Sequence, residues 1–113
     1  LIAIKRQWKA IKKMRRWSQN CKHNFYHRYV LMKAEWAHYF GLNRLASRHY
    51  KAAVHEMNQS QIIMDIGLVY ERVAHYYDRI GNHAENKAYI AQAVTGYQSW
   101  GAHAKAESLG KIE

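Results

Sequence analysis

The sequence predicts an all-α fold, an α-solenoid segment of antiparallel helix pairs with about five helices and a short C-terminal helix. Apolar residues recur at intervals of three and four, which is the period of an amphipathic helix. The helix patterns repeat after forty residues, and a repeat of this length is typical of stacked helical arrays. Fifteen aromatic residues and no proline also favour packed helices over loops.

The first expected helix runs from Ile2 to about Gln19. Its apolar residues occupy an arc of roughly 200° around the helix axis, and its basic residues fill most of the remaining side. A helix that packs on one side needs an apolar arc of little more than 100°. Only one neighbouring helix is expected for it in this chain, so part of the arc should stay exposed. We therefore predict a homodimer through the self-association residues Ile4, Trp8 and Ile11.

The next two expected helices form a pair hinged at Gly41. A turn over residues 18–24 leads into a helix over residues 25–40, with Asn24 as its cap. Gly41 ends that helix, because glycine readily adopts the positive φ of a helix end. The partner helix covers residues 43–59 and is followed by a turn. The side chains expected to face the core are Tyr26, Tyr29, Val30, the stem of Lys33, Ala34, Ala37, Leu45, Ala46, Tyr50, Ala53, Val54 and Met57.

The clearest helical pattern covers residues 70–101, where two amphipathic helices are hinged at Gly81. Asn82 follows the hinge and is placed to cap the second helix. A short final helix is expected over residues 102–109. The residues that recur at i, i+3, i+4 and i+7 are Tyr70, Val73, Ala74 and Tyr77 in one helix and Ile90, Ala93, Val94 and Tyr97 in the other.

Residues of the same class recur forty positions apart in these two helix pairs. Each unit of a repeat array buries its apolar face against its neighbours, so the recurrence predicts one stacked array. The matching positions are Ala34 with Ala74, Gly41 with Gly81, Tyr50 with Ile90, Ala53 with Ala93, Val54 with Val94 and Met57 with Tyr97.

The length of 113 residues predicts one domain, residues 1–113. The chain begins at Leu1 within a helical pattern, which suggests a fragment of a longer protein. The single Cys21 can form no internal disulfide, which favours a reducing compartment and hence a cytoplasmic location. No apolar run approaches the ~18 residues that a membrane span requires.

The net charge of +10 belongs to the first third of the chain. Residues 1–33 contain ten Lys or Arg and no acidic residue, whereas residues 34–113 contain eight of each. The simplest interpretation is a solvated helix face, but an acidic protein or neighbouring domain, nucleic acid or an anionic membrane surface would also suit it. Among partners we favour protein. The basic candidates for partner binding are Lys5, Lys9, Lys12 and Arg16.

A second candidate surface combines acidic residues with histidines. Glu71, His75 and Asp78 occur at i, i+4 and i+7 and therefore share one helix face. In a stack of helix pairs the first helices line a concave groove, so Glu35 and His38 are expected beside them. The groove is predicted to bind a partner; the alternatives are a metal or ligand site and a solvated face.

The sequence carries no recognisable catalytic motif. Residues 55–59 begin like a zinc-protease helix, but Gln59 stands where the second histidine ligand is needed. No glycine-rich loop of the phosphate-binding types is present. We therefore expect no enzyme activity, no catalytic residue, no metal and no cofactor.

Two sets of residues resemble the tetratricopeptide (TPR) pattern W-x2-L-G-x2-Y followed by A-x3-F. The period here is forty residues in place of thirty-four. The resemblance implies a TPR-like α-solenoid. The matching slots hold Val30, Lys33, Ala34, Ala37, Ala46 and Tyr50, and then Tyr70, Val73, Ala74, Tyr77, Asn86 and Ile90.

A longer resemblance covers most of residues 14–109 and is most distinctive over residues 97–105, Tyr-x2-Trp-Gly-Ala-x-Ala-Lys. Residues 71–77, the Gly81 turn and residues 88–93 also carry it. The chain resembles the end of the TPR-like helical region in very large bacterial signalling proteins. Those proteins join an AAA-type ATPase, often with a Ser/Thr kinase-like domain, to GAF and histidine-kinase output domains. The resemblance implies a location between sensor and output, and not an activity.

These observations predict a non-catalytic protein-interaction or signal-relay scaffold within a multidomain bacterial regulator. One alternative is a nucleic-acid-binding helical repeat that uses the basic first helix, and salt-dependent retention on DNA or RNA would distinguish it. The other alternative is a metal or ligand sensor that uses the histidine-rich groove, and a metal-dependent shift in melting temperature would distinguish that one.

Overall fold

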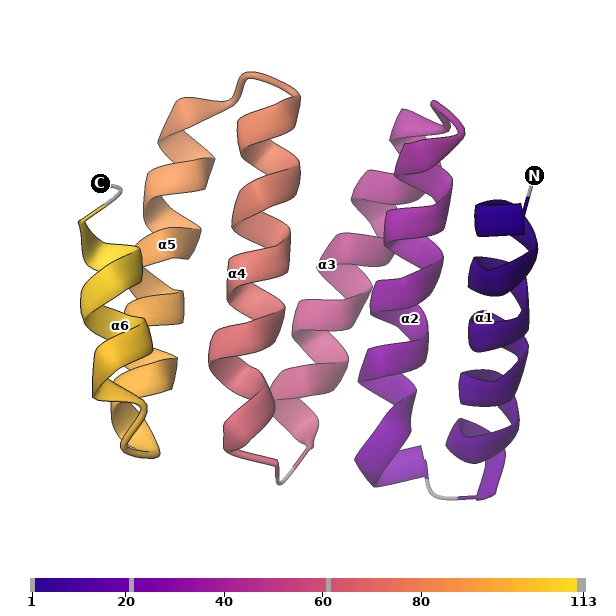
Figure 1. Ribbon diagram of the computed structural model, residues 1–113, viewed down its shortest axis with the longest axis horizontal. Helices are drawn as coiled ribbons and strands as arrows, with labels where there is room; N and C mark the ends of the chain where they lie inside the picture. The colour runs from indigo at the N-terminus through magenta and orange to yellow at the C-terminus, as the bar shows by residue number, and fades with distance from the viewer. Residues whose placement is uncertain (1, 21, 61, 112–113) are drawn as a thin grey trace. The chain divides into compact units, whose positions relative to one another are not determined.

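The computed structural model describes residues 2–20, 22–60 and 62–111, and it describes the side chains of residues 5–16, 26–60 and 62–111. The described residues form six α-helices and no strand, which confirms the all-α class (Figure 1). None of these helices is long and apolar enough to cross a membrane. The chain divides into two compact units, Leu1–Gln61 and Ile62–Glu113. The single domain expected from the length stays a prediction.

Unit 1 consists of α1 (Ile2–Asn20), α2 (Lys22–Tyr39) and α3 (Asn43–Gln59). Helix α2 packs against both α1 and α3. The bounds of α3 match the prediction, but the turn expected over residues 18–24 is wrong, because α1 continues to Asn20 and Asn24 lies inside α2. Ser and Asn favour caps and turns but do not exclude a helix, and this stretch has no glycine or proline that would stop one.

The core of unit 1 contains most of the side chains that the periodicity placed there. Leu45 is an exception, because its side chain is 38% exposed in the first turn of α3. His27 was not expected in the core, yet it is 1% exposed. Among the described side chains of this unit, the buried hydrophobic residues are Ile11, Val30, Leu31, Ala34, Ala37, Ala46, Tyr50, Ala53 and Met57.

Unit 2 consists of α4 (Met64–Arg79), α5 (His83–Ser99) and α6 (His103–Gly110). Helix α5 packs against both α4 and α6. The sequence pattern placed the start of this helix at Tyr70, but α4 begins six residues earlier, at Met64. One cluster of the core joins the three helices through Ala74, Ile90, Ala93, Tyr97, Ala106 and Leu109.

Two glycines allow α4 and α5 to approach closely. A Cβ atom added to Gly96 would lie 2.7 Å from the backbone nitrogen of Gly67 and 2.9 Å from its Cα. A Cβ added to Gly67 would lie 2.8 Å from the ring of Tyr97. Glycine weakens a helix interior, so its use here reflects the close backbone contact and not the local helix.

Three turns between helices share one hydrogen-bonded geometry. Gly41, Gly81 and Gly101 have φ values of 74°, 81° and 92°, which confirms the prediction for the first two. In each turn the glycine N–H donates to the carbonyl three residues earlier and the next N–H donates to the carbonyl five residues earlier, at 2.9 to 3.1 Å. This pair of bonds defines the Schellman motif that ends a helix. Asn82 caps α5 as predicted, since its Oδ1 accepts from the Glu85 N–H at 3.2 Å.

Burial follows the forty-residue correspondence between the two units. Ala34 and Ala74 are both fully buried, as are Ala53 and Ala93. The larger matched side chains are buried as well, with Tyr50 at 1% and Ile90 at 3% exposure, and Met57 at 1% and Tyr97 at 7%. Matched positions therefore have matched environments in each unit.

Candidate functional site

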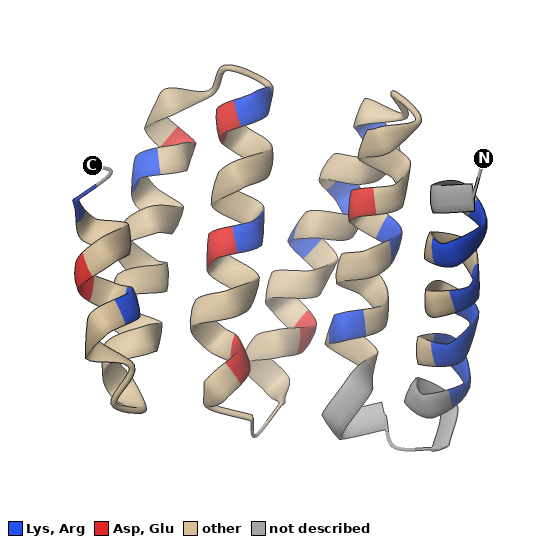
Figure 2. Cartoon of the chain, in the orientation of Figure 1, with Lys and Arg blue, Asp and Glu red and all other residues tan. Residues whose placement is uncertain are grey.

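Four of the basic residues of α1 lie along one stripe of the helix. Lys5, Lys9, Lys12 and Arg16 recur at i, i+4, i+7 and i+11, and all four are exposed. We call these four residues the basic stripe. Figure 2 shows the Lys and Arg positions of α1 in blue. The excess charge belongs to unit 1, where residues 1–61 contain thirteen Lys or Arg and two acidic residues, against five and six in residues 62–113. An anionic partner is therefore attracted to unit 1 before unit 2.

A row of aromatic rings runs from α1 to the end of α2. The ring centroids of Trp8 and Trp36 are 5.3 Å apart, those of Trp36 and Phe40 are 4.6 Å apart, and those of Phe40 and Tyr39 are 5.2 Å apart. Trp8, Phe40 and Tyr39 nevertheless remain 45%, 44% and 60% exposed. Such a patch of exposed aromatic surface is typical of an interaction site.

A pocket of about 230 Å³ opens between α1, α2 and α3, beside this aromatic row. Ile11, Ala37 and Leu45 supply aliphatic surface. The remaining lining residues are aromatic or basic: Trp8, Tyr29, Trp36, Lys12, Arg15, Lys33 and His49.

Positive charge lies close to the rings of this pocket. The Lys12 ammonium lies 5.4 Å from the Trp8 ring centroid, and the Lys33 ammonium lies 4.6 Å from that of Tyr29. Burial lowers the pKa of His49, and the charges of Lys33 and Arg48 lower it further, so the neutral form of the ring is favoured. The described residues that line the pocket include no acidic side chain.

Sequence reasoning found the basic stripe but missed the pocket, and a signal for it was present. Trp8, Lys12 and Arg15 occur at i, i+4 and i+7 on α1. The same spacing recurs on α2, where the set of aromatic and basic residues is Tyr29, Lys33 and Trp36. Two adjacent helices that carry this pattern can face each other across one site.

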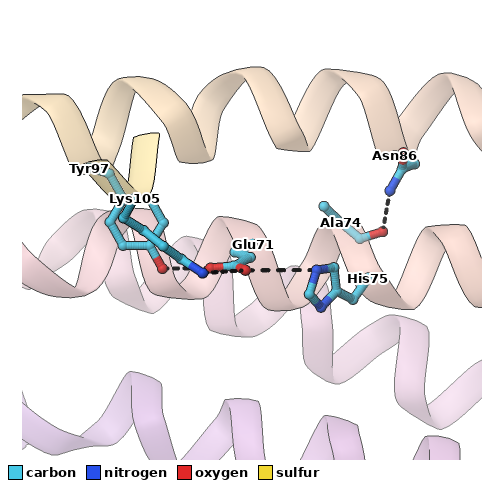
Figure 3. Close-up of polar contacts among 6 residues, drawn as sticks. All are labelled: Glu71, Ala74, His75, Asn86, Tyr97 and Lys105. Atoms are coloured by element: carbon cyan, nitrogen blue, oxygen red, sulfur yellow. Dashed lines mark hydrogen bonds and ion pairs between the residues drawn. The ribbon is translucent and has the colours of Figure 1, made fainter. Parts of the chain in front are cut away.

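Glu71, a predicted partner-binding residue, is engaged within unit 2 (Figure 3). The Tyr97 hydroxyl donates to its Oε1 at 2.6 Å, and the Lys105 ammonium donates to its Oε2 at 3.2 Å. Burial acts to raise the pKa of Glu71, but the hydrogen bonds from Tyr97 and Lys105 outweigh it and hold the pKa below its usual value. The side chain is only 13% exposed, and its hydrogen bonds join α4, α5 and α6. Its role in partner binding stays a prediction.

The other residues of the predicted groove belong to both units. His75 is 48% exposed with its Nε2 atom 3.8 Å from Oε2 of Glu71, and Asp78 is exposed. Glu35 and His38 are half-buried in unit 1. The groove therefore stays a prediction. Within the described ranges, no group of three or more His, Cys, Asp or Glu side chains is arranged to hold a metal ion.

The residues predicted to mediate self-association have different environments. Trp8 is exposed as expected, but Ile11 is only 6% exposed, because it packs within unit 1 where α1 meets α2. The expectation that Ile11 stays exposed is therefore corrected. The side chain of Ile4 lies outside the described residues. Dimerisation itself stays a prediction.

Comparisons of the chain with protein-family models, curated proteins and solved structures find no match in any of the three.

Proposed function

We propose that this chain is a non-catalytic protein-interaction or signal-relay scaffold, a TPR-like α-solenoid segment of a multidomain bacterial regulator. Two observations support the repeat. The turns at Gly41, Gly81 and Gly101 share one hydrogen-bonding pattern, and matched positions forty residues apart are buried alike. Rigid helical stacks of this type present surfaces that hold a partner without any chemistry of their own.

The observation that carries the proposal is the basic stripe beside an exposed aromatic row in unit 1. A row of cations attracts an acidic segment and orients it, while aromatic residues are enriched among the few residues that contribute most of the binding energy at protein interfaces. Lys12 connects the two features, because it belongs to the stripe and also lines the pocket. The partner is therefore an acidic protein segment or an acidic surface of a neighbouring domain.

The ring packing favours protein over nucleic acid as the partner. Single-stranded nucleic acid binds proteins by stacking its bases on available aromatic faces. Trp8 contacts both Trp36 and the ammonium of Lys12, and Trp36 also contacts Phe40. These rings already pack on one another, with centroids 4.6 to 5.3 Å apart, so part of the surface on which bases would stack is occupied within the protein.

Charge reversal tests the proposal. Lys5→Glu combined with Lys9→Glu should weaken binding of a fluorescein-labelled, glutamate-rich peptide about tenfold or more at low salt, and less as salt is added. The matched control is Lys87→Glu with Lys111→Glu, two exposed lysines of unit 2, which should bind as the wild type does. Both double variants should have a free energy of unfolding within about 0.5 kcal/mol of the wild-type value.

Two results would count against an acidic protein partner. One is equal loss of binding in both double variants. The other is tighter binding of a labelled single-stranded oligonucleotide than of the peptide with the same net charge, which would favour the nucleic-acid alternative.

A further inference from the structure

The pocket of unit 1 is small for a metabolite or cofactor. Sites for drug-sized molecules enclose about 300 to 1,000 Å³. This pocket encloses about 230 Å³, which suits one ring-sized group rather than a whole ligand of that class. A partner that uses it therefore inserts a single side chain, as anchor residues do at protein interfaces.

The lining selects the kind of side chain. Trp8, Tyr29 and Trp36 offer aromatic surface, and Ile11 and Leu45 add aliphatic surface, so an apolar planar group is favoured over a polar one. An arginine or lysine anchor is disfavoured, because the pocket already contains Lys12, Arg15 and Lys33 and its described lining has no acidic residue.

The surroundings select the residues next to the anchor. Lys12 lines the pocket and is followed along the same stripe by Lys9 and Lys5 in one direction and by Arg16 in the other. Carboxylates on either side of an inserted ring would lie close to these cations. An aromatic anchor with acidic neighbours therefore matches both features at once.

We infer that the pocket takes one aromatic side chain of an acidic partner segment, whose flanking carboxylates lie along the basic stripe. This inference rests on the proposed function and adds the anchor and its place. The Lys12 ammonium lies over the Trp8 ring and the Lys33 ammonium lies over the Tyr29 ring, so the inserted ring is bordered by aromatic side chains and by cations.

The test compares three labelled peptides of equal length on the full chain. One has phenylalanine between two runs of glutamate, one has alanine in its place, and one keeps the phenylalanine but replaces glutamate by glutamine. Fluorescence anisotropy should show the phenylalanine–glutamate peptide binding about tenfold tighter than the alanine peptide, with the glutamine peptide the weakest.

A pocket-filling variant locates the effect. Leu45 lines the pocket and is 38% exposed, so Leu45→Trp fills the space with little risk to the fold. The variant should bind the phenylalanine peptide no more tightly than the alanine peptide. Its affinity for the alanine peptide should equal that of the wild type. Leu42→Trp is the matched control, because Leu42 is 48% exposed and does not line the pocket.

The outcomes separate this inference from the proposed function. Equal affinity for the phenylalanine and alanine peptides in the wild type overturns the anchor and leaves the proposed function standing. If Leu42→Trp and Leu45→Trp reduce the affinity for the phenylalanine peptide equally, the assignment of the anchor to this pocket is overturned. Equal binding of the glutamine peptide overturns the role of the flanking carboxylates, and no binding of any acidic peptide means that the proposed function itself fails.

Discussion

The Glu71 carboxylate joins the three helices of unit 2, because its partners Tyr97 and Lys105 come from α5 and α6 (Figure 3). Asn86 adds a second tie between α5 and α4, since its Nδ2 donates to the Ala74 carbonyl oxygen at 2.8 Å. Hydrogen bonds to a charged group contribute about 1.5 to 3 kcal/mol, more than neutral ones. These side chains therefore fix how the helices of unit 2 are oriented.

Glu71→Gln should lower the free energy of unfolding at pH 7 by about 1 to 2 kcal/mol, because it removes the charge that Tyr97 and Lys105 share. The pKa of Glu71 is lowered in the folded state, so the unfolded state binds more protons near pH 4 and the stabilisation fades as pH falls through the folded pKa. Urea denaturation against pH should show a smaller acid-side loss in Glu71→Gln than in the wild type, because the contribution of Glu71 is absent.

The control for this prediction is Glu107→Gln. Glu107 pairs with Lys111 at 3.6 Å, but both side chains are about three-quarters exposed, so its loss should change stability by less than about 0.5 kcal/mol. A destabilisation of Glu107→Gln as large as that of Glu71→Gln would contradict a specific role for Glu71.

The individual residues of the basic stripe could be predicted from the sequence, because charge and helical spacing are local properties. The partners of Glu71 could not. Tyr97 and Lys105 are 26 and 34 residues further along the chain, and their approach depends on how α5 and α6 pack. The aromatic and basic residues of the pocket do share a local spacing on α1 and on α2, but the pocket itself exists only once three helices have packed, so its volume and full lining could not be predicted.

At the scale of elements, α4 and α5 depend on the contact between Gly67 and Gly96. Gly96→Ala should destabilise the protein by at least about 1 kcal/mol, because a Cβ 2.7 Å from backbone forces the helices apart and this outweighs the gain in helix propensity. Gly110→Ala is the control: a Cβ there meets nothing within 4 Å, so stability should be unchanged or higher. Thermal denaturation of both variants measures the difference, and equal melting temperatures would contradict the close approach.

The glycine turns give a second prediction for the elements. Gly81→Val should cost about 1 kcal/mol or more, because a β-branched residue disfavours the positive φ of 81° even though no atom lies near the new side chain. Gly81→Asn should cost clearly less, since asparagine tolerates this conformation. Equal melting temperatures for wild type and Gly81→Val would show that the turn does not constrain the helices.

The helix ends at glycine were predictable because a positive φ requires a specific residue type. The connection between α1 and α2 was not, because its polar residues are compatible with helix as well as turn. The start of α4 was placed too late because Gly67 interrupts the helical pattern. That glycine is explained only by its contact with α5, which local sequence does not reveal.

For the whole molecule, self-association through α1 is a further expectation. Trp8 is 45% exposed and can pack against a second copy, whereas Ile11 is buried and contributes nothing. Because the basic stripe would repel its copy, the dimer should strengthen with added salt. Light scattering at tens of micromolar should show a dimer that Trp8→Glu disrupts and Trp100→Glu does not. A monomeric wild type at high salt would exclude it.

Heteronuclear NMR during titration with the phenylalanine–glutamate peptide tests the central claim most directly, because it reports every site at once. The account predicts saturable shifts along the basic stripe and at the indole N–H groups of Trp8 and Trp36, while the indole of Trp100 in unit 2 stays unchanged. Shifts confined to unit 2, or no saturable shift at any residue, would contradict the assignment of the binding surface to unit 1.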